Sequence, residues 1–135
     1  MSDRPPVVAV INTSPDVVDM LRLALEHAGF VVVSAFTFEI REGATDVESF
    51  VRQHRPSVIV YDIAPPYEAN WQLFLHIRAM EVMKGRRFVL TTTNARQVQK
   101  LVGSAEQIHE IVGKPYDLDE ITRATHDALR AMSER

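Results

Sequence analysis

Asp62, Thr91 and Lys114 are three side chains that could carry phosphoryl chemistry, and each stands where an apolar, strand-like run ends. The carboxyl ends of parallel strands meet at one edge of a sheet, and ligands bind in the crevice outside them. There a carboxylate can act as a nucleophile, an ammonium group can pair with incoming negative charge, and a hydroxyl can donate to a phosphoryl oxygen. Alone, Asp62 would be read as an ordinary turn aspartate. The three residues together favour transfer of a phosphoryl group to Asp62.

Five apolar runs predict the strands that would position these residues. The run over residues 58–62 is apolar up to its last residue, which is typical of a strand buried on both faces of a parallel sheet. Pro65 and Pro66 then prevent the strand from continuing. The five expected strands cover residues 7–11, 31–36, 58–62, 88–91 and 108–112.

Helical periodicity separates these runs, so strands and helices alternate five times along the chain. This alternation predicts an α/β fold, in which a five-stranded parallel sheet lies between two layers of helices. The helices are expected to begin at residues that can cap them: Ser14, Thr45, Asn70, Asn94 and Asp117. We expect a single domain over residues 7–135, preceded by a flexible leader over residues 1–6.

Residues 37–44 fit neither periodicity, and we expect them to form a surface excursion. Its apolar residues, Phe38 and Ile40, could contact a partner protein or pack as a lid over the core. Single exposed apolar residues are common on protein surfaces, so the sequence leaves both interpretations open.

Composition excludes several classes of function. Hydrophobic residues make up 46% and charged residues 24% of the 135 residues, as in ordinary globular proteins. The net charge of −3 argues against direct binding of nucleic acid, which needs a basic face. The absence of cysteine excludes thiol catalysis and thiolate metal sites. The histidines lack metal-ligand spacing and no apolar run is long enough to span a membrane, so we expect a cytoplasmic protein without a membrane partner.

Four segments, at residues 10–16, 58–66, 89–92 and 113–116, carry a resemblance that spans essentially the whole chain. In their order and spacing they resemble the receiver (response-regulator, CheY-like) domains of two-component signalling. The resemblance implies a flavodoxin-like, doubly wound sheet with strand order 2-1-3-4-5 and about five helices. It also implies that Asp62 is the phosphoacceptor, Thr91 the family's hydroxyl residue and Lys114 the family's lysine.

The chain departs from this family at the end of the first strand. Typical members carry an acidic pair there that helps to hold Mg²⁺, and here the two positions are Asn12 and Thr13. Mg²⁺ prefers carboxylate and water oxygens, so the loss of two carboxylates should weaken its binding and leave Asp62 as the expected ligand. The aromatic residue that usually stands three residues before the lysine is Ile111 here.

Two classes of function follow from this comparison. In the first, Asp62 accepts a phosphoryl group from a histidine kinase or phosphotransfer protein, with atypical or impaired dependence on metal, and the domain signals to a downstream protein. In the second, the chain is a pseudo-receiver that binds its partners independently of phosphorylation. The missing acidic pair favours the second class, whereas Asp62, Thr91 and Lys114 favour the first, which we prefer. We expect no independent enzymatic activity, and the sequence leaves homodimerisation open.

We predict that added Mg²⁺ barely shifts the melting temperature, because a ligand stabilises only above its dissociation constant. The double substitution Asn12→Asp and Thr13→Asp should destabilise the metal-free protein, since like charges crowd Asp62. It should also create a Mg²⁺-dependent rise in melting temperature and speed labelling of Asp62 by a small phosphodonor. Thermal denaturation with and without Mg²⁺ measures the effect. A strong Mg²⁺-dependent rise in the wild type would contradict the prediction and point to further ligands such as Asp16.

Overall fold

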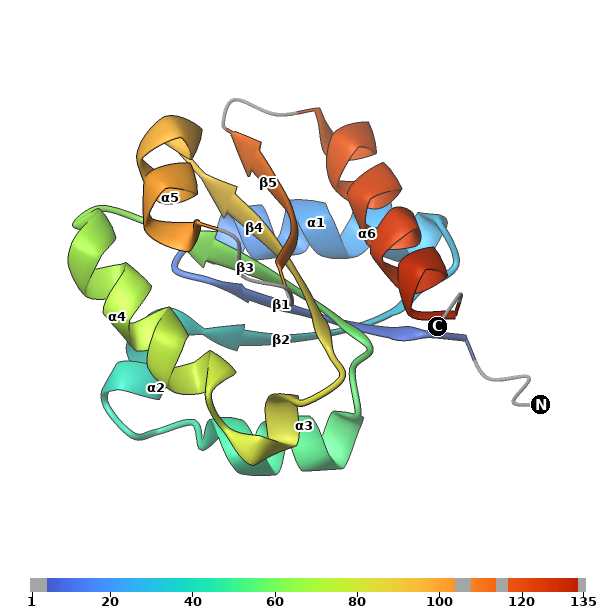
Figure 1. Ribbon diagram of the computed structural model, residues 1–135. Coiled ribbons are helices and arrows are strands. Elements are labelled where there is room, and N and C mark those ends of the chain that lie inside the picture. Colours follow the sequence, from blue (N-terminus) through green and yellow to red (C-terminus); the bar gives the residue numbers. More distant parts are fainter. Residues whose placement is uncertain (1–4, 104–107, 114–116, 134–135) are drawn as a thin grey trace.

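Five parallel strands form one sheet in the order β2-β1-β3-β4-β5 (Figure 1). The computed structural model describes residues 5–103, 108–113 and 117–133. The strands are β1 (Val7–Asn12), β2 (Val31–Phe36), β3 (Val58–Ile63), β4 (Arg87–Thr92) and β5 (Ile108–Gly113). The predicted strands and the strand order of the flavodoxin-like fold are therefore confirmed.

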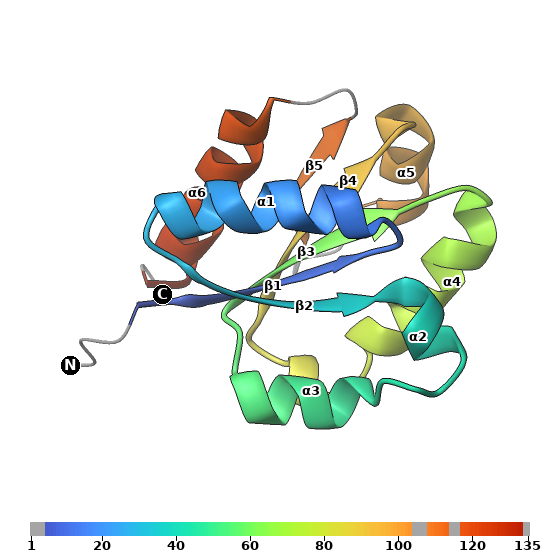
Figure 2. The ribbon, with the colours of Figure 1, turned by 180° about the vertical axis from the view of Figure 1, so that it is seen from behind.

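Helices cover both faces of the sheet, as Figures 1 and 2 show from opposite sides. One face carries α1 (Pro15–His27) and α6 (Leu118–Ser133). The other carries α2 (Thr37–Arg41), α3 (Val47–His54), α4 (Tyr67–Arg78), the 3-10 helix η1 (Glu81–Met83) and α5 (Ala95–Val102). The described residues thus contain α2 and η1 in addition to the five helices expected from the sequence. No helix within the described ranges is long and apolar enough to cross a membrane.

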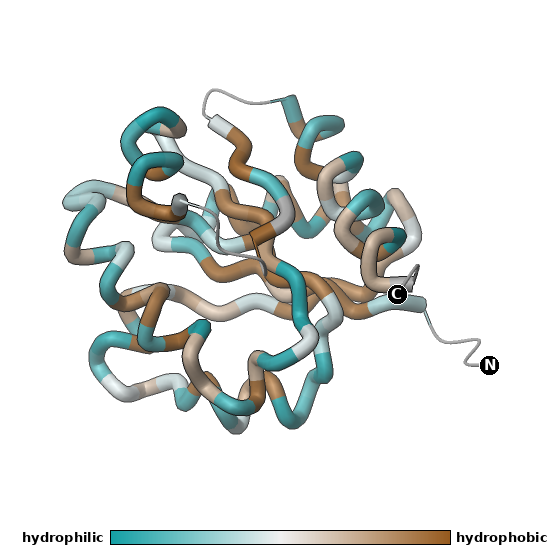
Figure 3. The backbone as a smooth tube through the Cα atoms, in the orientation of Figure 1, coloured by the Kyte–Doolittle hydropathy of each residue, from teal (hydrophilic) through white to brown (hydrophobic). Residues whose placement is uncertain are grey.

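Two hydrophobic cores lie on the two faces of the sheet, and β3 contributes to both. Val58 and Val60 face the core under α1 and α6, whereas Ile59, Tyr61 and Ile63 face the core under α3 and α4. Every residue of β3 is buried, as expected for an inner strand of a parallel sheet. The hydrophobic colouring of Figure 3 accordingly follows the central strands.

Two of the predicted helix starts are confirmed by their capping bonds. The Ser14 hydroxyl accepts a hydrogen bond from the amide N–H of Val17 at 3.3 Å, with Pro15 as the first residue of α1. The Asn94 side chain accepts one from the amide N–H of Gln97 at 3.1 Å and starts α5. Each bond satisfies one of the free N–H groups that begin a helix.

Two other predicted helix starts were wrong. The helix expected to begin at Asn70 begins at Tyr67 instead, because Pro66 is already extended at the N-cap position, and Asn70 lies inside α4. The helix expected to begin with a Thr45 capping box has Asp46 at its N-cap, and this carboxylate accepts from the Ser49 hydroxyl at 2.7 Å instead of capping the backbone.

The segment 37–44 begins with the short helix α2 and is only partly the surface excursion that the sequence predicted. Thr37 is buried, and Ile40 is half-buried and packs against the core under α3 and α4. Phe38 is 46% exposed and stacks on Phe36 with ring centroids 5.5 Å apart. Ile40 therefore covers part of the core, whereas Phe38 leaves part of its ring exposed to solvent.

We expect Phe74→Ala to lower the free energy of unfolding by about 3–5 kcal/mol. The Phe74 ring is fully buried and contacts the rings of Tyr61, Trp71 and Phe88, with centroids 4.9–5.2 Å apart. The matched control is Phe38→Ala, which removes an exposed ring and should cost less than about 1 kcal/mol. Urea denaturation measures both. Equal losses would show that the core is not centred on Phe74.

Candidate functional site

Asp62 and Thr91 lie side by side at the carboxyl edge of the sheet. They are paired in the register of β3 and β4, and the Thr91 hydroxyl donates a hydrogen bond to Oδ1 of Asp62 at 2.6 Å. Asp62 is 4% exposed and Thr91 is fully buried. A hydrogen bond to an ionised carboxylate is among the strong ones, so this contact fixes the orientation of the Asp62 side chain.

The end of β1 places Asn12 and Thr13 beside this pair. Asn12 is buried, and its Oδ1 accepts a hydrogen bond from the amide N–H of Ser14 at 3.0 Å. Thr13 is exposed at the start of the turn. The Asn12 amide therefore shapes the turn into α1, which ties one of its oxygen lone pairs to the backbone.

These residues do not fit a strong Mg²⁺ site. Around Asp62, the end of β1 offers an amide oxygen that is already bonded and an exposed hydroxyl, where Mg²⁺ favours carboxylates. The described part of the chain holds no cluster of three or more His, Cys, Asp or Glu side chains able to bind a metal.

Lys114, the third predicted site residue, lies outside the described residues. The residue before it, Gly113, ends β5 and pairs with Thr92 of β4. Ile111, which stands at the aromatic position of the family, is half-buried and packs against the core under α3 and α4.

The threonines that follow Thr91 build the rim of the site. The Thr92 hydroxyl is buried and accepts from the amide N–H of Asn94 at 3.2 Å, which forms the turn into α5. The Thr93 hydroxyl shares a hydrogen bond with the Tyr67 hydroxyl at the start of α4. This second bond joins the connections that follow β3 and β4, and it joins residues too far apart in the chain for a local pattern to predict.

Arg41 is a further residue of this edge that sequence reasoning missed. Its guanidinium donates a hydrogen bond to Oδ1 of Asn70, and Nδ2 of Asn70 donates to the carbonyl oxygen of Ala64 at 2.6 Å. The chain of bonds ties α2 to α4 and to the residues that follow Asp62. A cation inside an otherwise unassigned segment was the only sequence signal for this role.

Two buried hydroxyls on this side of the sheet have no hydrogen-bond partner among the described residues: those of Thr37 and Tyr61. Burial raises the pKa of the Tyr61 hydroxyl well above its usual value, the charge of Arg41 opposes that rise, and the charge of Asp62 adds to it. An unpaired buried hydroxyl costs about 1–3 kcal/mol. These two buried hydroxyl groups could therefore still form hydrogen bonds.

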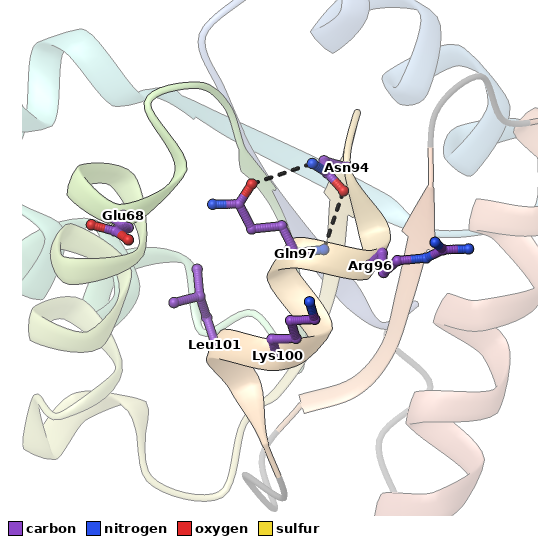
Figure 4. A pocket seen from close by; sticks show the side chains of 6 residues that line it. All are labelled: Glu68, Asn94, Arg96, Gln97, Lys100 and Leu101. Carbon is purple, nitrogen blue, oxygen red and sulfur yellow. Dashed lines mark hydrogen bonds between the residues drawn. The ribbon is translucent and has the colours of Figure 1, made fainter.

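A groove of about 460 Å³ separates α4 from α5. Figure 4 shows Glu68 on α4, with the other lining residues on α5 and at its N-cap. Arg96 and Lys100 give the α5 side positive charge opposite the Glu68 carboxylate. Because α4 follows β3 and α5 follows β4, both walls begin a few residues after Asp62 and Thr91.

Solved structures place this architecture in a known class, whereas no protein-family model and no curated protein sequence matches the chain. A sensor protein from Polaromonas sp. JS666 matches with a TM-score of 0.76 at 20% identity, over 94% of this chain and 98% of that one. A response regulator from Thermotoga maritima matches with a TM-score of 0.72 at 19% identity, over 93% and 98%. A response regulator receiver protein from Sinorhizobium medicae WSM419 matches with a TM-score of 0.71 at 21% identity, over 97% and 99%. The chain has the CheY-like fold of response-regulator receiver domains.

We expect Tyr61→Phe to raise the free energy of unfolding by about 1 kcal/mol near neutral pH, because it removes an unpaired buried hydroxyl. The raised pKa of Tyr61 means that the native state holds this proton more tightly than the unfolded chain. The wild type should therefore lose stability as the pH rises above about 10, where the unfolded tyrosine ionises. The advantage of Tyr61→Phe should grow over that range in urea denaturation. An advantage that stays constant with pH would show that the hydroxyl is solvated.

Proposed function

We propose that the chain is a signalling receiver domain that accepts a phosphoryl group on Asp62 from a histidine kinase or phosphotransfer protein. The observation that carries this proposal is the buried Asp62 carboxylate, bonded by the Thr91 hydroxyl at 2.6 Å at the carboxyl edge of a CheY-like sheet. Ligands of open α/β sheets bind at this edge. The likeness to solved response regulators supports the same assignment.

In the proposed reaction, a carboxylate oxygen of Asp62 attacks the phosphorus atom of a phosphohistidine. A new O–P bond forms as the P–N bond breaks, and the electron pair of that bond returns to the donor imidazole. The product is an acyl phosphate on Asp62. The Thr91 hydroxyl, which bonds the carboxylate in this structure, would then donate to a phosphoryl oxygen. By the resemblance to receiver domains, Lys114 would supply an ammonium group that pairs with the negative charge of the phosphoryl group.

Phosphorylation of Asp62 would change the shape of the groove between α4 and α5. The Tyr67–Thr93 bond joins the connections that lead from β3 and β4 into those helices. A shift of Thr91 towards a phosphoryl group would act on Thr93, two residues further on, and so on the position of α5. A downstream protein that binds this groove would sense the state of Asp62.

The pseudo-receiver remains a second candidate function, and the end of β1 is the observation that favours it. Asn12 bonds the backbone of its own turn, and no acidic side chain occupies either of the two positions where receivers keep their acidic pair. Such a domain would bind its partner in one state, whatever the level of phosphodonor.

Labelling with a small phosphodonor, followed by intact-mass analysis, separates the two functions. We expect the wild type to gain the mass of one phosphoryl group and Asp62→Asn to gain none, because no other described acid ends a buried strand beside a hydroxyl. The matched control is Asp16→Asn, which removes an exposed acid near the same edge and should label normally. Undiminished labelling of Asp62→Asn would refute the assignment of the site. A wild type that takes no label from any donor would favour the pseudo-receiver.

A further inference from the structure

A pocket of about 410 Å³ lies next to the candidate phosphoacceptor site, between the ends of β1 and β2 and the start of α4. Thr13 reaches it from the end of β1, Thr37 and Arg41 from α2, and Ala64 and Asn70 from the chain that follows β3. The described residues that line it include no acidic side chain, so Arg41 carries its one formal charge. The electrostatics of this pocket therefore favour an anion.

Thr37 forms part of the wall of the pocket through its side chain, which is 3% exposed. Its hydroxyl oxygen is fully buried and has no hydrogen-bond partner among the described residues. An oxygen atom of a ligand in the pocket therefore does not reach this hydroxyl, and the polar contacts of an occupant come from Arg41 and Thr13.

Arg41 is held in place to face such an occupant. The hydrogen bond to Asn70 uses one of its five N–H groups, and Asn70 is itself anchored on the carbonyl of Ala64. The remaining N–H groups can bond the paired oxygens of a carboxylate or phosphate. The charge of Arg41 also opposes the rise that burial causes in the pKa of the nearby Tyr61 hydroxyl.

The other walls are apolar and set the rest of the ligand. The Phe38 ring, the adjacent prolines Pro65 and Pro66, and Ala69 line the same pocket. Phe38 is 46% exposed, so part of its ring is free to cover a bound molecule. The pocket is larger than an inorganic phosphate needs, which leaves space for an organic group against these walls.

We propose that this pocket binds a small organic anion. Its carboxylate or phosphate bonds Arg41 and the hydroxyl of Thr13, and its apolar part lies against Phe38 and the two prolines. The proposal does not rest on phosphorylation of Asp62. It gives the domain a second input beside the candidate phosphoacceptor, through the α2 segment.

The test is an NMR titration of the full, unphosphorylated chain at constant ionic strength. The probes are benzoate, phenyl phosphate and the neutral benzyl alcohol. We expect saturable shifts of the amide signals of Phe38, Arg41 and Ala69 with at least one anion, and none with the alcohol. The two anions distinguish a carboxylate from a phosphate ligand. Asp62→Asn should still bind, so a failure of the proposed phosphotransfer would leave this result standing.

Substitutions assign the binding to the named groups. Arg41→Gln should weaken the anion about tenfold or more, as expected for loss of a charge-assisted bond. The matched control is Arg130→Gln, an exposed arginine of α6 on the other face of the sheet, which should bind as the wild type does. Thr13→Val should weaken binding by a smaller factor than Arg41→Gln, because it removes one neutral hydrogen bond.

Three outcomes would overturn the proposal. Saturable binding by neither anion would show that the pocket has no ligand of this class. Equal binding of benzyl alcohol would show an apolar cavity, and equal weakening by Arg130→Gln would show general attraction to surface charge. Should Arg41→Gln fail to fold, Thr13→Val and Arg41→Lys give the same test, with Lys retaining the charge but not the paired N–H geometry.

Discussion

The burial of β3 on both faces is the constraint on which the rest of the structure depends. Its apolar side chains fill the two cores alternately, which fixes the strand in the centre of the sheet and leaves Asp62 almost without exposure at the carboxyl edge. A buried carboxylate is costly unless it is bonded. The parallel register of β3 and β4 meets this requirement, because it sets the Thr91 hydroxyl directly beside Asp62. The candidate phosphoacceptor side chain is thus held by the same strand pairing that builds the sheet.

The loops that follow the strands surround Asp62 and are held by hydrogen bonds of their polar side chains. Asn12 closes the turn after β1, and the Tyr67–Thr93 bond links the turns after β3 and β4. Arg41 ties the excursion after β2 to Asn70 of α4. In each connection a polar side chain forms a hydrogen bond to the backbone or to another side chain. These bonds hold the loops in defined positions, although the loops have no hydrophobic core of their own. A change at Asp62 therefore has short, bonded routes to α4 and α5.

The sequence was informative wherever short-range patterns decide the structure. An apolar run ending in an acid predicted β3 and Asp62, and the spacing of Asn94 and Gln97 predicted the start of α5, because both signals lie within a few residues. Asn70 shows where such reasoning fails. A polar residue before an apolar helix matches a cap locally, but the start of α4 is set by Pro66, and Asn70 instead bonds Arg41, 29 residues away. The pocket beside Asp62 depends on that distant contact, so no local pattern could predict it.

The charges at this edge differ from those expected of an ordinary receiver. By the resemblance, an ordinary receiver gathers three carboxylates, whose mutual repulsion raises their affinity for protons and for a divalent cation. Here Asn12 and Thr13 are neutral, and Arg41 adds a positive charge from α2. Coulomb interactions are strongest where water is excluded, and Asp62 and Thr37 are both almost fully buried. With fewer carboxylates at this edge, an incoming phosphoryl group or organic anion would meet less repulsion than in an ordinary receiver. The neutral residues at the carboxyl end of β1 and the cation of α2 therefore act on an incoming anion in the same direction.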